Sequence, residues 1–456
     1  MVKIYSKSAA LCPDDDTNGQ PLRKHLNADA LFALMYEEFG KIRDHRTGDI
    51  VIPLADALMA GFAMFSLKDP SLLAFDKRRK EEPENLHTVY LIDQIPCDTQ
   101  MRTILDEVAV DYLRWGFRRI FAQAQRGKVL EKMTCLGGYF LISGDGTEFF
   151  SSEKVISPYC LTRTKKNGKI EYYQQVYAAA IVNPGMREVI PLCPEMIVPQ
   201  DGTDKQDCER NAARRFYEKF RTEHPHLRCI VTEDALSSNA PHIRDLQRLD
   251  LRFILGVKPG DHVYLFEQVE KAAQRGETTD FILPDPEDPT ILHAFRFLNG
   301  VALNKSNQDL LVNFLEYWET DEEGNVKKRF SWVTDLSITK ESAFEIMRAG
   351  RTRWRIENET FNTLKNQGYN LGHNYGLGEK HLSAVFVHLM MLAFLVDQVQ
   401  QACCKLFQAA EKKCGSKKLL WERLRAIFYL CMVGSMEDIL RVIALGYKIP
   451  CPRPSG

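Results

Sequence analysis

The sequence has no marked excess of charge of either sign and no paired-cysteine motif. Its 456 residues carry 60 Lys and Arg against 61 Asp and Glu, which gives a formal net charge of −1. A chain this close to neutral has no global attraction to nucleic acid or membrane, so any polyanion must bind to local basic patches. None of the twelve cysteines forms a C-x-x-C pair. The sequence therefore indicates neither a zinc ribbon nor a thioredoxin-type site, and it is typical of a reducing cytoplasm.

An apolar leader and a long apolar run are also missing. The opening MVKIYSKSAALCPDDD has no apolar core, so no secretory signal is expected. The most apolar stretch, LSAVFVHLMMLAFLV at 382–396, is interrupted by Ser383 and His388. It is short for a membrane span and predicts a buried core helix. We therefore expect a cytoplasmic protein with no membrane partner.

The order of helical and strand patterns predicts an α/β chain in which a mixed sheet is flanked by helices. The opening part predicts amphipathic helices at 27–43, 53–66, 70–79 and 98–126. The next part predicts strands at 137–150, 169–182 and 186–198, a helix at 204–225, a strand within 227–238, a helix at 240–250 and a strand from 251. Residues 262–333 are rich in strand and turn patterns and predict a β insertion.

These patterns divide the chain into five parts. They are a helical N-terminal region at 1–130, the first part of the α/β core at 131–258, a β-rich insertion at 259–335, the completion of the core with a glutamate-bearing helix at 336–400, and a helical C-terminal region at 401–456. No repeat of 20–50 residues is visible, so the parts are not copies of one unit.

Glu357 lies in the stretch RTRWRIENETFNTLKNQG at 351–368, which is predicted to form one helix. At 100° per residue, three apolar residues share a stripe with Glu357: Trp354, Phe361 and Leu364. Glu359 points to the opposite side. A carboxylate among apolar groups needs a partner, because taking an unpaired charge out of water costs several kcal/mol. That partner is either Arg353, one turn earlier, or a metal ion.

Two further acids follow predicted strands. Asp145 comes after the apolar YFLIS and lies between Gly144 and Gly146, where a backbone or a ligand can approach closely. Asp234 ends the strand CIVTED. If the two strands are neighbours, both carboxylates emerge at the same part of the sheet, and a helix can bring Glu357 to join them.

Three crowded carboxylates repel one another, and divalent cations remove that repulsion. Mg²⁺ prefers oxygen ligands, and two such ions about 3.5–4 Å apart can clamp both oxygens of a phosphoryl displacement. Each acid also has an ordinary explanation. Asp145 can be a turn aspartate, Asp234 can cap the following helix and leave Glu233 as the working acid, and Glu357 can pair with an arginine.

The motifs resemble those of bacterial insertion-sequence transposases of the DDE superfamily, over roughly residues 130–400. The matching stretches are DGTEFFSS from Asp145, VTEDALSS around Asp234, and GRTRWRIENETFNTLKNQGY around Glu357, followed by LGHNYGLGEKHLS. The resemblance implies a ribonuclease H-like core in which these three acids are catalytic. It further implies that they bind two Mg²⁺ ions, with Mn²⁺ as a substitute and Asp145 shared between the ions, and that a β-rich insertion precedes the glutamate helix.

Related cut-and-paste elements carry a tyrosine, arginine, glutamate and lysine signature around this helix. Arg353 and Glu357 fit it, whereas Gly350 stands at the tyrosine position and Lys365 lies one residue beyond the usual spacing. The resemblance thus implies that Arg353 contacts a strand-end phosphate and that Lys365 contacts DNA. It leaves open whether excision passes through a DNA hairpin.

Two further DNA contacts are expected outside the acids. By resemblance, Trp318 in the insertion holds a flipped base by stacking; alternatively, it packs on its own sheet. In RWGFRRIFAQAQRGK at 114–128, Arg118 and Arg119 are predicted to meet backbone phosphates. The alternative is an amphipathic helix that packs its apolar residues inward and leaves its arginines merely solvated. Those apolar residues are Trp115, Phe117 and Ile120.

The function expected from this resemblance is a DNA transposase. Such an enzyme hydrolyses a phosphodiester at the ends of its element and joins the freed 3′-hydroxyl to target DNA. Its partners are the terminal inverted repeats, the target duplex and a second copy of the chain in the synapse. The alternatives are a catalytically inactive or co-opted DNA-binding protein, and a repair or recombination nuclease on the same scaffold.

Overall fold

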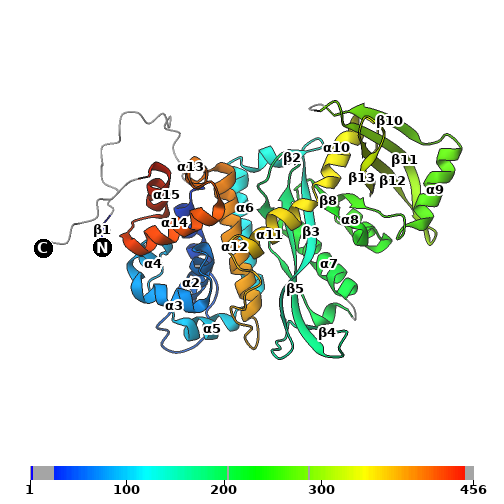
Figure 1. Cartoon of the computed structure of the whole chain (residues 1–456). Coiled ribbons are helices and arrows are strands. Elements are labelled where there is room, and N and C mark those ends of the chain that lie inside the picture. The colour runs from blue at the N-terminus through cyan, green and yellow to red at the C-terminus, as the bar shows by residue number, and fades with distance from the viewer. Residues whose placement is uncertain (1, 4–24, 203–204, 286–287, 447–456) are drawn as a thin grey trace. The chain divides into compact units, whose positions relative to one another are not determined.

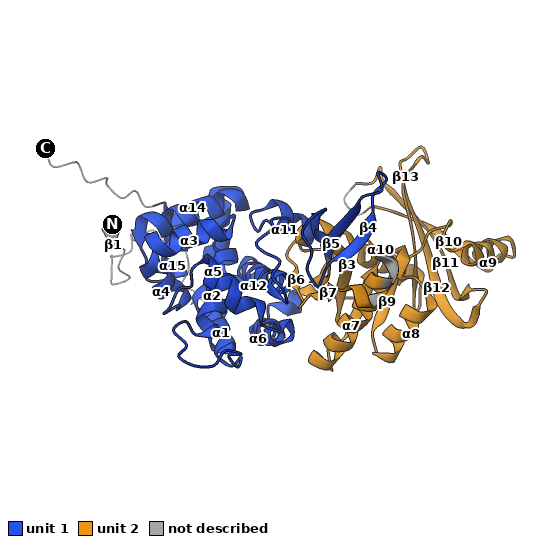
Figure 2. Cartoon of the chain, turned by 90° about the horizontal axis from the view of Figure 1, so that it is seen from below, with its two compact units in different colours: residues 1–132, 148–174, 361–456 blue, residues 133–147, 175–360 orange. Residues whose placement is uncertain are grey.

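A computed structural model describes residues 2–3, 25–202, 205–285 and 288–446 (Figure 1). The chain divides into two compact units, shown in blue and orange in Figure 2. Unit 1 combines both ends of the chain with one internal segment: Met1–Lys132, Glu148–Gln174 and Phe361–Gly456. Unit 2 comprises Met133–Thr147 and Gln175–Thr360. The predicted N-terminal and C-terminal regions extend into 4–24 and 447–456, which lie outside the described residues.

Unit 1 is mainly helical. Its N-terminal helices are α1 (Ala28–Gly40), α2 (Leu54–Ser66), α3 (Leu72–Glu81), α4 (Pro83–Tyr90), α5 (Asp98–Asp106) and α6 (Arg114–Arg126). Its C-terminal helices are α11 (Asn362–Asn366), α12 (Leu382–Cys403), α13 (Lys405–Cys414), α14 (Lys417–Leu430) and α15 (Met436–Leu445). Two short strands, β1 (Val2–Lys3) and β14 (Cys431–Met432), pair in parallel.

Helix α12 is the core of unit 1. By length and composition it is apolar enough to cross a membrane, but 94% of its most apolar window is buried inside the structure. The carboxylate of Asp106, at the end of α5, accepts the backbone N–H groups of Glu379, Lys380, His381 and Leu382 at 2.8–3.2 Å. Asp106 thereby satisfies donors at the start of α12, which a helix leaves unpaired. The prediction of a buried core helix is confirmed.

The helices predicted at 27–43, 53–66 and 70–79 are confirmed, but two predictions in unit 1 are wrong. The segment 98–126 is not one helix, because a 3₁₀ turn at Val110–Leu113 separates α5 from α6. No helix was predicted between residues 79 and 98, but helix α4 begins there at Pro83. Proline is tolerated at the first helical position, where its missing N–H would have no partner.

A mixed sheet runs through unit 2, so the α/β class is confirmed. Its strands are β2 (Thr134–Cys135), β3 (Tyr139–Ser152), β5 (Ile170–Val182), β6 (Ile190–Pro191), β7 (Glu195–Ile197), β8 (Cys229–Glu233), β9 (Arg252–Gly256), β10 (Thr279–Pro284), β11 (Leu292–Asn304), β12 (Asn307–Thr320) and β13 (Val326–Thr334). The order is β10-β11-β12-β13-β9-β8-β3-β5-β4, where β4 (Leu161–Thr164) pairs with the part of β5 that belongs to unit 1. Strands β3, β8 and β9 are parallel neighbours, whereas β9 to β13 and the insertion strands pair antiparallel.

The helices of unit 2 are α7 (Lys205–Glu223), α8 (Ala240–Arg248), α9 (Val263–Gln274) and α10 (Lys340–Arg351). The β-rich insertion is present as β10 to β13, but it begins with a helix that the sequence analysis missed. In α9 three apolar residues at helical spacing are buried: Leu265, Val269 and Ala272. The strand predicted at 186–198 is two short strands, because prolines at 191 and 194 lack the N–H that a ladder needs.

Candidate functional site

The parallel register of β3 and β8 brings two aspartates level with each other. The two strands pair from Phe140 with Cys229 to Ser143 with Thr232. Asp145 and Asp234 each follow the last pair by two residues. The two strands are therefore neighbours, which meets the condition set in the sequence analysis, and both carboxylates lie at the same part of the sheet. Strand β3 does not end near Asp145 but continues to Ser152, in agreement with the strand predicted at 137–150.

Two buried strand hydroxyls connect the glutamate segment to this part of the sheet. Ser143 Oγ donates to the carbonyl of Arg353 at 3.1 Å, and Thr232 Oγ1 donates to the carbonyl of Gly350 at 3.5 Å. The accepting carbonyls lie at and just beyond the C-terminal end of α10, and each also accepts a backbone N–H, that of Gly350 from Arg353 at 3.4 Å and that of Arg353 from Ile356 at 3.1 Å. These contacts fix the backbone that leads to Glu357 beside both strand ends.

The segment that carries Glu357 is not the regular helix that the sequence predicted. Helix α10 ends at Arg351, a turn follows, and Ile356–Phe361 forms a π-helix before α11. The angular step of 100° per residue therefore fails, and Trp354 is 49% exposed instead of buried with Phe361. π-Turns in helices occur frequently at functional sites. Glu357 and Glu359 are both half-buried.

Arg353 connects two of the three acids. Its Nη1 atom lies 2.7 Å from Glu357 Oε1 and 3.9 Å from Asp145 Oδ2. Its guanidinium carbon lies 4.8 Å from the centre of the Trp354 ring. Of the two partners considered for Glu357, the structure contains the arginine.

Asp145 lies among other carboxylates. Burial, and then the charges of Glu209 and Asp234, raise the pKa of the Asp145 carboxyl to about 7, although Arg353 and a backbone N–H act in the opposite direction. Glu209 lies on α7, and a Cβ atom added to Gly146 would come within 2.6 Å of its carboxylate. Glu209 is thus a fourth acid at the site. The sequence analysis missed it because only the packing of α7 on β3 brings it there.

A buried group of hydrogen-bonded side chains next to Asp234 explains why position 233 is a glutamate and position 144 is a glycine. The Glu233 carboxylate is 2% exposed and accepts hydrogen bonds from the hydroxyls of Tyr177 and Tyr217, and it bonds His242 Nε2 at 2.7 Å. Burial alone would raise the pKa of Glu233, but His242 and both tyrosines hold it below its ordinary value. A Cβ at position 144 would lie 2.0 Å from the Tyr177 hydroxyl, so the close approach that Gly144 permits is made by a side chain.

Glu233 is therefore a structural anion, and Asp234 is the acid that reaches the surface. One oxygen of Asp234 accepts the N–H of Leu236 at 2.9 Å and caps the short helix Ala235–Ser237. This capping role was the alternative considered for Asp234. It uses Oδ1 and coexists with a position beside Asp145.

In the described part of the chain, no three His, Cys, Asp or Glu side chains converge closely enough to enclose a metal ion. The donor set nevertheless fits a hard divalent cation, since every acid at the site offers oxygen ligands, and burial followed by the charges of Glu209 and Asp234 raises the pKa of Asp145. The Arg353 guanidinium is the cation now placed among them. Asp145, Asp234 and Glu357 are the residues that would hold Mg²⁺ once that side chain turns away.

Gly350, at the signature's tyrosine position, has a steric explanation. A Cβ added there would lie 2.5 Å from the indole nitrogen of Trp332 on β13. A larger side chain would collide with this ring. Lys365 lies on α11 in unit 1, half-buried, and burial lowers the pKa of its ammonium while the charge of Glu148 raises it.

The residues predicted to contact DNA in the insertion and in α6 differ in their surroundings. Trp318 on β12 is half-buried, with the guanidinium carbons of Arg296 and Arg329 at 5.9 and 5.6 Å from the ring centre. On α6, the guanidinium of Arg118 lies over the Trp115 ring at 4.5 Å. The apolar face of α6 buries Phe117 and Ile120 but leaves Trp115 54% exposed, and Arg119 pairs with Glu38 at 3.1 Å.

A hollow of about 510 Å³ in unit 2 adjoins the glutamate segment. Its lining includes Trp354 and Asn358 from that segment together with four basic residues: Lys328, Arg348, Arg351 and Arg355. Three acids also line it: Asp285, Glu319 and Glu359. The sequence analysis missed this hollow, because residues from the insertion and from the end of α10 form it only after folding.

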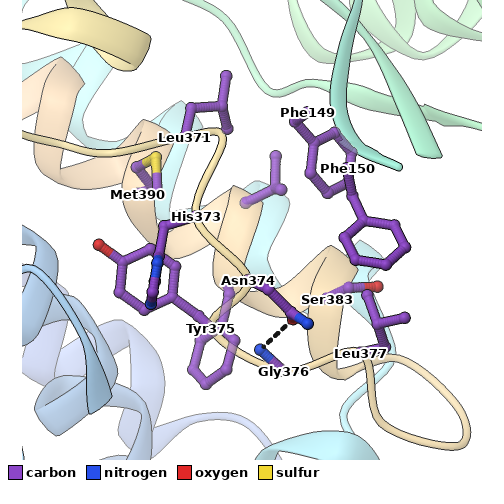
Figure 3. A pocket seen from close by; sticks show the side chains of 12 residues that line it. Phe149, Phe150, Leu371, His373, Asn374, Tyr375, Gly376, Leu377, Ser383 and Met390 are labelled. Carbon is purple, nitrogen blue, oxygen red and sulfur yellow. Dashed lines mark hydrogen bonds between the residues drawn. The ribbon is translucent and has the colours of Figure 1, made fainter. Parts of the chain in front are cut away.

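Unit 1 contains a smaller hollow at the far end of β3 (Figure 3). Phe149 and Phe150 line it together with the loop before α12, in which the Asn374 side chain accepts the N–H of Gly376 at 3.0 Å. The buried hydroxyl of Ser383 has no partner among the described residues. The room, about 20 Å³, suits one water-sized group, so this hollow is not a nucleotide site.

Comparison with protein-family models finds no match for this chain, and comparison with curated proteins finds none either.

Proposed function

We propose that this chain is a metal-dependent DNA transposase of the DDE type with a ribonuclease H-like core. The observation that carries the proposal is the joint placement of the three acids. The parallel register sets Asp145 and Asp234 level, and the hydroxyls of Ser143 and Thr232 hold the glutamate segment at the same strand ends. Parallel β3, β8 and β9, followed by a β-rich insertion before the glutamate, support the fold assignment.

In the proposed reaction, Asp145, Asp234 and Glu357 would hold two Mg²⁺ ions, and the bound ions would supply activation of the attacking water or 3′-hydroxyl and stabilisation of the leaving oxygen. The other roles in the reaction belong to side chains of the protein. The strand hydroxyls orient the glutamate segment, the buried Glu233 cluster fixes the end of β8, and Arg353 is placed to contact a phosphate next to the acids. Phosphodiester hydrolysis at the element end is followed by attack of the freed 3′-hydroxyl on target DNA.

The hollow beside Trp354 supports DNA as the substrate. Arginines suit phosphate oxygens, and an exposed ring accepts any base by stacking. Several of the basic residues already pair with acids, such as Arg351 with Glu319 at 3.4 Å and Arg355 with Glu359 at 3.9 Å. DNA phosphates would therefore replace these carboxylates as partners of the basic residues. We place the active species in the cytoplasm, as a homodimer that joins two element ends.

This function is tested by DNA from the borders of the gene. Short inverted repeats there are expected, and purified protein incubated with a duplex carrying both borders should cut at the repeat ends in Mg²⁺ or Mn²⁺ and not in Ca²⁺. Sequencing the products locates each cut. Tight, repeat-specific binding without any cut would instead indicate an inactive DNA-binding protein, and cutting that ignores the repeats would indicate a nuclease.

Replacing Trp318 tests the proposed base contact in the insertion. We expect Trp318→Ala to slow end processing by about tenfold, since loss of one stacked base costs about 1–3 kcal/mol. The matched variant is Trp354→Ala, which removes the ring at the edge of the hollow. A folded Trp318→Ala protein that processes ends at the normal rate would retire the base contact at this position.

Replacing the α6 arginines tests DNA binding by unit 1. Arg118→Ala is expected to lower the slope of log affinity against log salt by about 0.9, the value for one lost phosphate contact. Arg119→Ala should lower it less, because this side chain pairs with Glu38. Filter binding of the full-length chain over a salt series provides the slopes. Identical slopes for wild type and both variants would mean that α6 does not touch DNA.

A further inference from the structure

The positive charge placed between the catalytic acids belongs to the protein itself. A single nitrogen, Arg353 Nη1, lies within 4 Å of a carboxylate oxygen of both Asp145 and Glu357. The Arg353 side chain is only 15% exposed, so solvent screens these contacts incompletely. A guanidinium in this position offsets the repulsion between the two carboxylates, which a bound metal ion would otherwise have to offset.

The guanidinium of Arg353 and the backbone of Arg353 have different contacts. The backbone carbonyl accepts the Ser143 hydroxyl, which fixes the start of the side chain at the strand end. The guanidinium itself rests on Trp354, a ring that is 49% exposed. Rotation about side-chain bonds can therefore carry the charged head away from the acids without moving the backbone.

We propose that Arg353 neutralises Asp145 and Glu357 until a DNA phosphate takes its guanidinium, and that metal loading of the site is thereby controlled by DNA binding. The inference rests on the proposed function. A guanidinium forms paired hydrogen bonds with carboxylates and phosphates alike, so it can exchange one for the other. In the protein without DNA, the guanidinium of Arg353 lies between the two carboxylates. In the DNA complex, the two carboxylates are released from Arg353 and can bind metal.

The same segment offers a matched control. Arg355 and Glu359 repeat the i, i+4 arrangement of Arg353 and Glu357 two residues later, at 3.9 Å. Arg355 Nη2 also donates to the Pro184 carbonyl at 3.1 Å, and within the described residues Arg355 forms an ion pair only with Glu359. Removing Arg355 changes the charge of the segment by the same amount but leaves the pairing of Asp145 and Glu357 in place.

The test measures Mn²⁺ affinity of the full-length chain by calorimetry, without DNA, so that it does not depend on catalysis. Arg353→Gln should bind Mn²⁺ about tenfold more tightly than wild type, since it removes a positive charge that lies 2.7 Å from Glu357 and 3.9 Å from Asp145. Arg353→Lys, which keeps the charge, and Arg355→Gln should stay close to wild type. Thermal unfolding confirms that each variant is folded. Unchanged or weaker binding by folded Arg353→Gln overturns the inference.

A second arm adds the border duplex. DNA should tighten Mn²⁺ binding by wild type about tenfold and change it little in Arg353→Gln, and Mn²⁺ should tighten DNA binding by wild type by the same factor. Equal tightening in both proteins overturns the inference while leaving the proposed function standing. If no protein binds Mn²⁺ with or without DNA, the proposed metal site itself fails, and the inference fails with it.

Discussion

Alanine at any one of Asp145, Asp234 or Glu357 is expected to abolish cutting of border DNA while leaving binding to that DNA largely intact. The three carboxylates hold the metals as one unit, so each single loss should reduce the rate by at least about a thousandfold and the losses should not add. The measurement is the cutting rate in Mg²⁺, with a gel-shift titration to confirm binding. Substantial Mg²⁺-dependent cutting by one folded variant would remove that residue from the site.

Glu359→Ala is the control for the glutamate. Glu359 lies on the same π-helical segment but faces Arg355 and the hollow, whereas Glu357 pairs with Arg353, which also lies 3.9 Å from Asp145. The loss of Glu359 should be mild. If Glu359 proves essential and Glu357 dispensable, the wrong glutamate of this segment has been assigned to the metals.

Asp145→Asn is expected to stabilise the metal-free protein, increasingly so as the pH rises from about 4 to 8. The pKa of Asp145 is raised from 3.8 to about 7 in the folded chain, chiefly by burial and then by Glu209 and Asp234. Between these two values the folded state holds a proton that the unfolded state releases, so wild type loses stability as the pH rises through this window. Asparagine has no proton to lose there. Since one pKa unit corresponds to about 1.4 kcal/mol, the advantage is at most about 4 kcal/mol above pH 7.

Urea unfolding of both proteins in EDTA at pH 4, 6 and 8 measures this difference. The two curves should nearly coincide at pH 4, where the aspartic acid is neutral in both states, and separate by pH 8. Adding Mg²⁺ should stabilise wild type and not the variant, because a ligand that binds only the folded state raises its stability. A variant that is less stable than wild type at pH 8 would show that Asp145 is not destabilised by its carboxylate neighbours.

The sequence could predict which residues form the site and their order along the chain, but not the contacts between them. Apolar stretches that lead to Asp145 and Asp234 are visible in the sequence, and their parallel pairing is the simplest way to place two carboxylates together. The helix facing of Glu357 could not be predicted, because a break after Arg351 and a π-helical turn change the angular step that a regular helix would have. The presence of an arginine partner was foreseen as one alternative; its position between two acids was not.

Other features depend on packing alone. Glu209 becomes part of the site only because α7 packs its carboxylate against Gly146, and Gly350 is required because Trp332 fills the adjacent space. The sequence signal for each was a lone glycine or a lone acid, which is common on any surface. The β insertion was visible in its strand pattern, whereas its opening helix α9 was missed because its apolar spacing was not distinguished from that of the strands after it.

The most direct test of the central claim is to locate the metal. Crystals of the full-length chain with border duplex, grown with Mn²⁺, should show anomalous difference peaks between Asp145, Asp234 and Glu357, about 3.5–4 Å apart, with the Arg353 guanidinium turned to a DNA phosphate. Peaks elsewhere in the complex, or a duplex bound with Arg353 still between Asp145 and Glu357 and no metal beside them, would contradict the account.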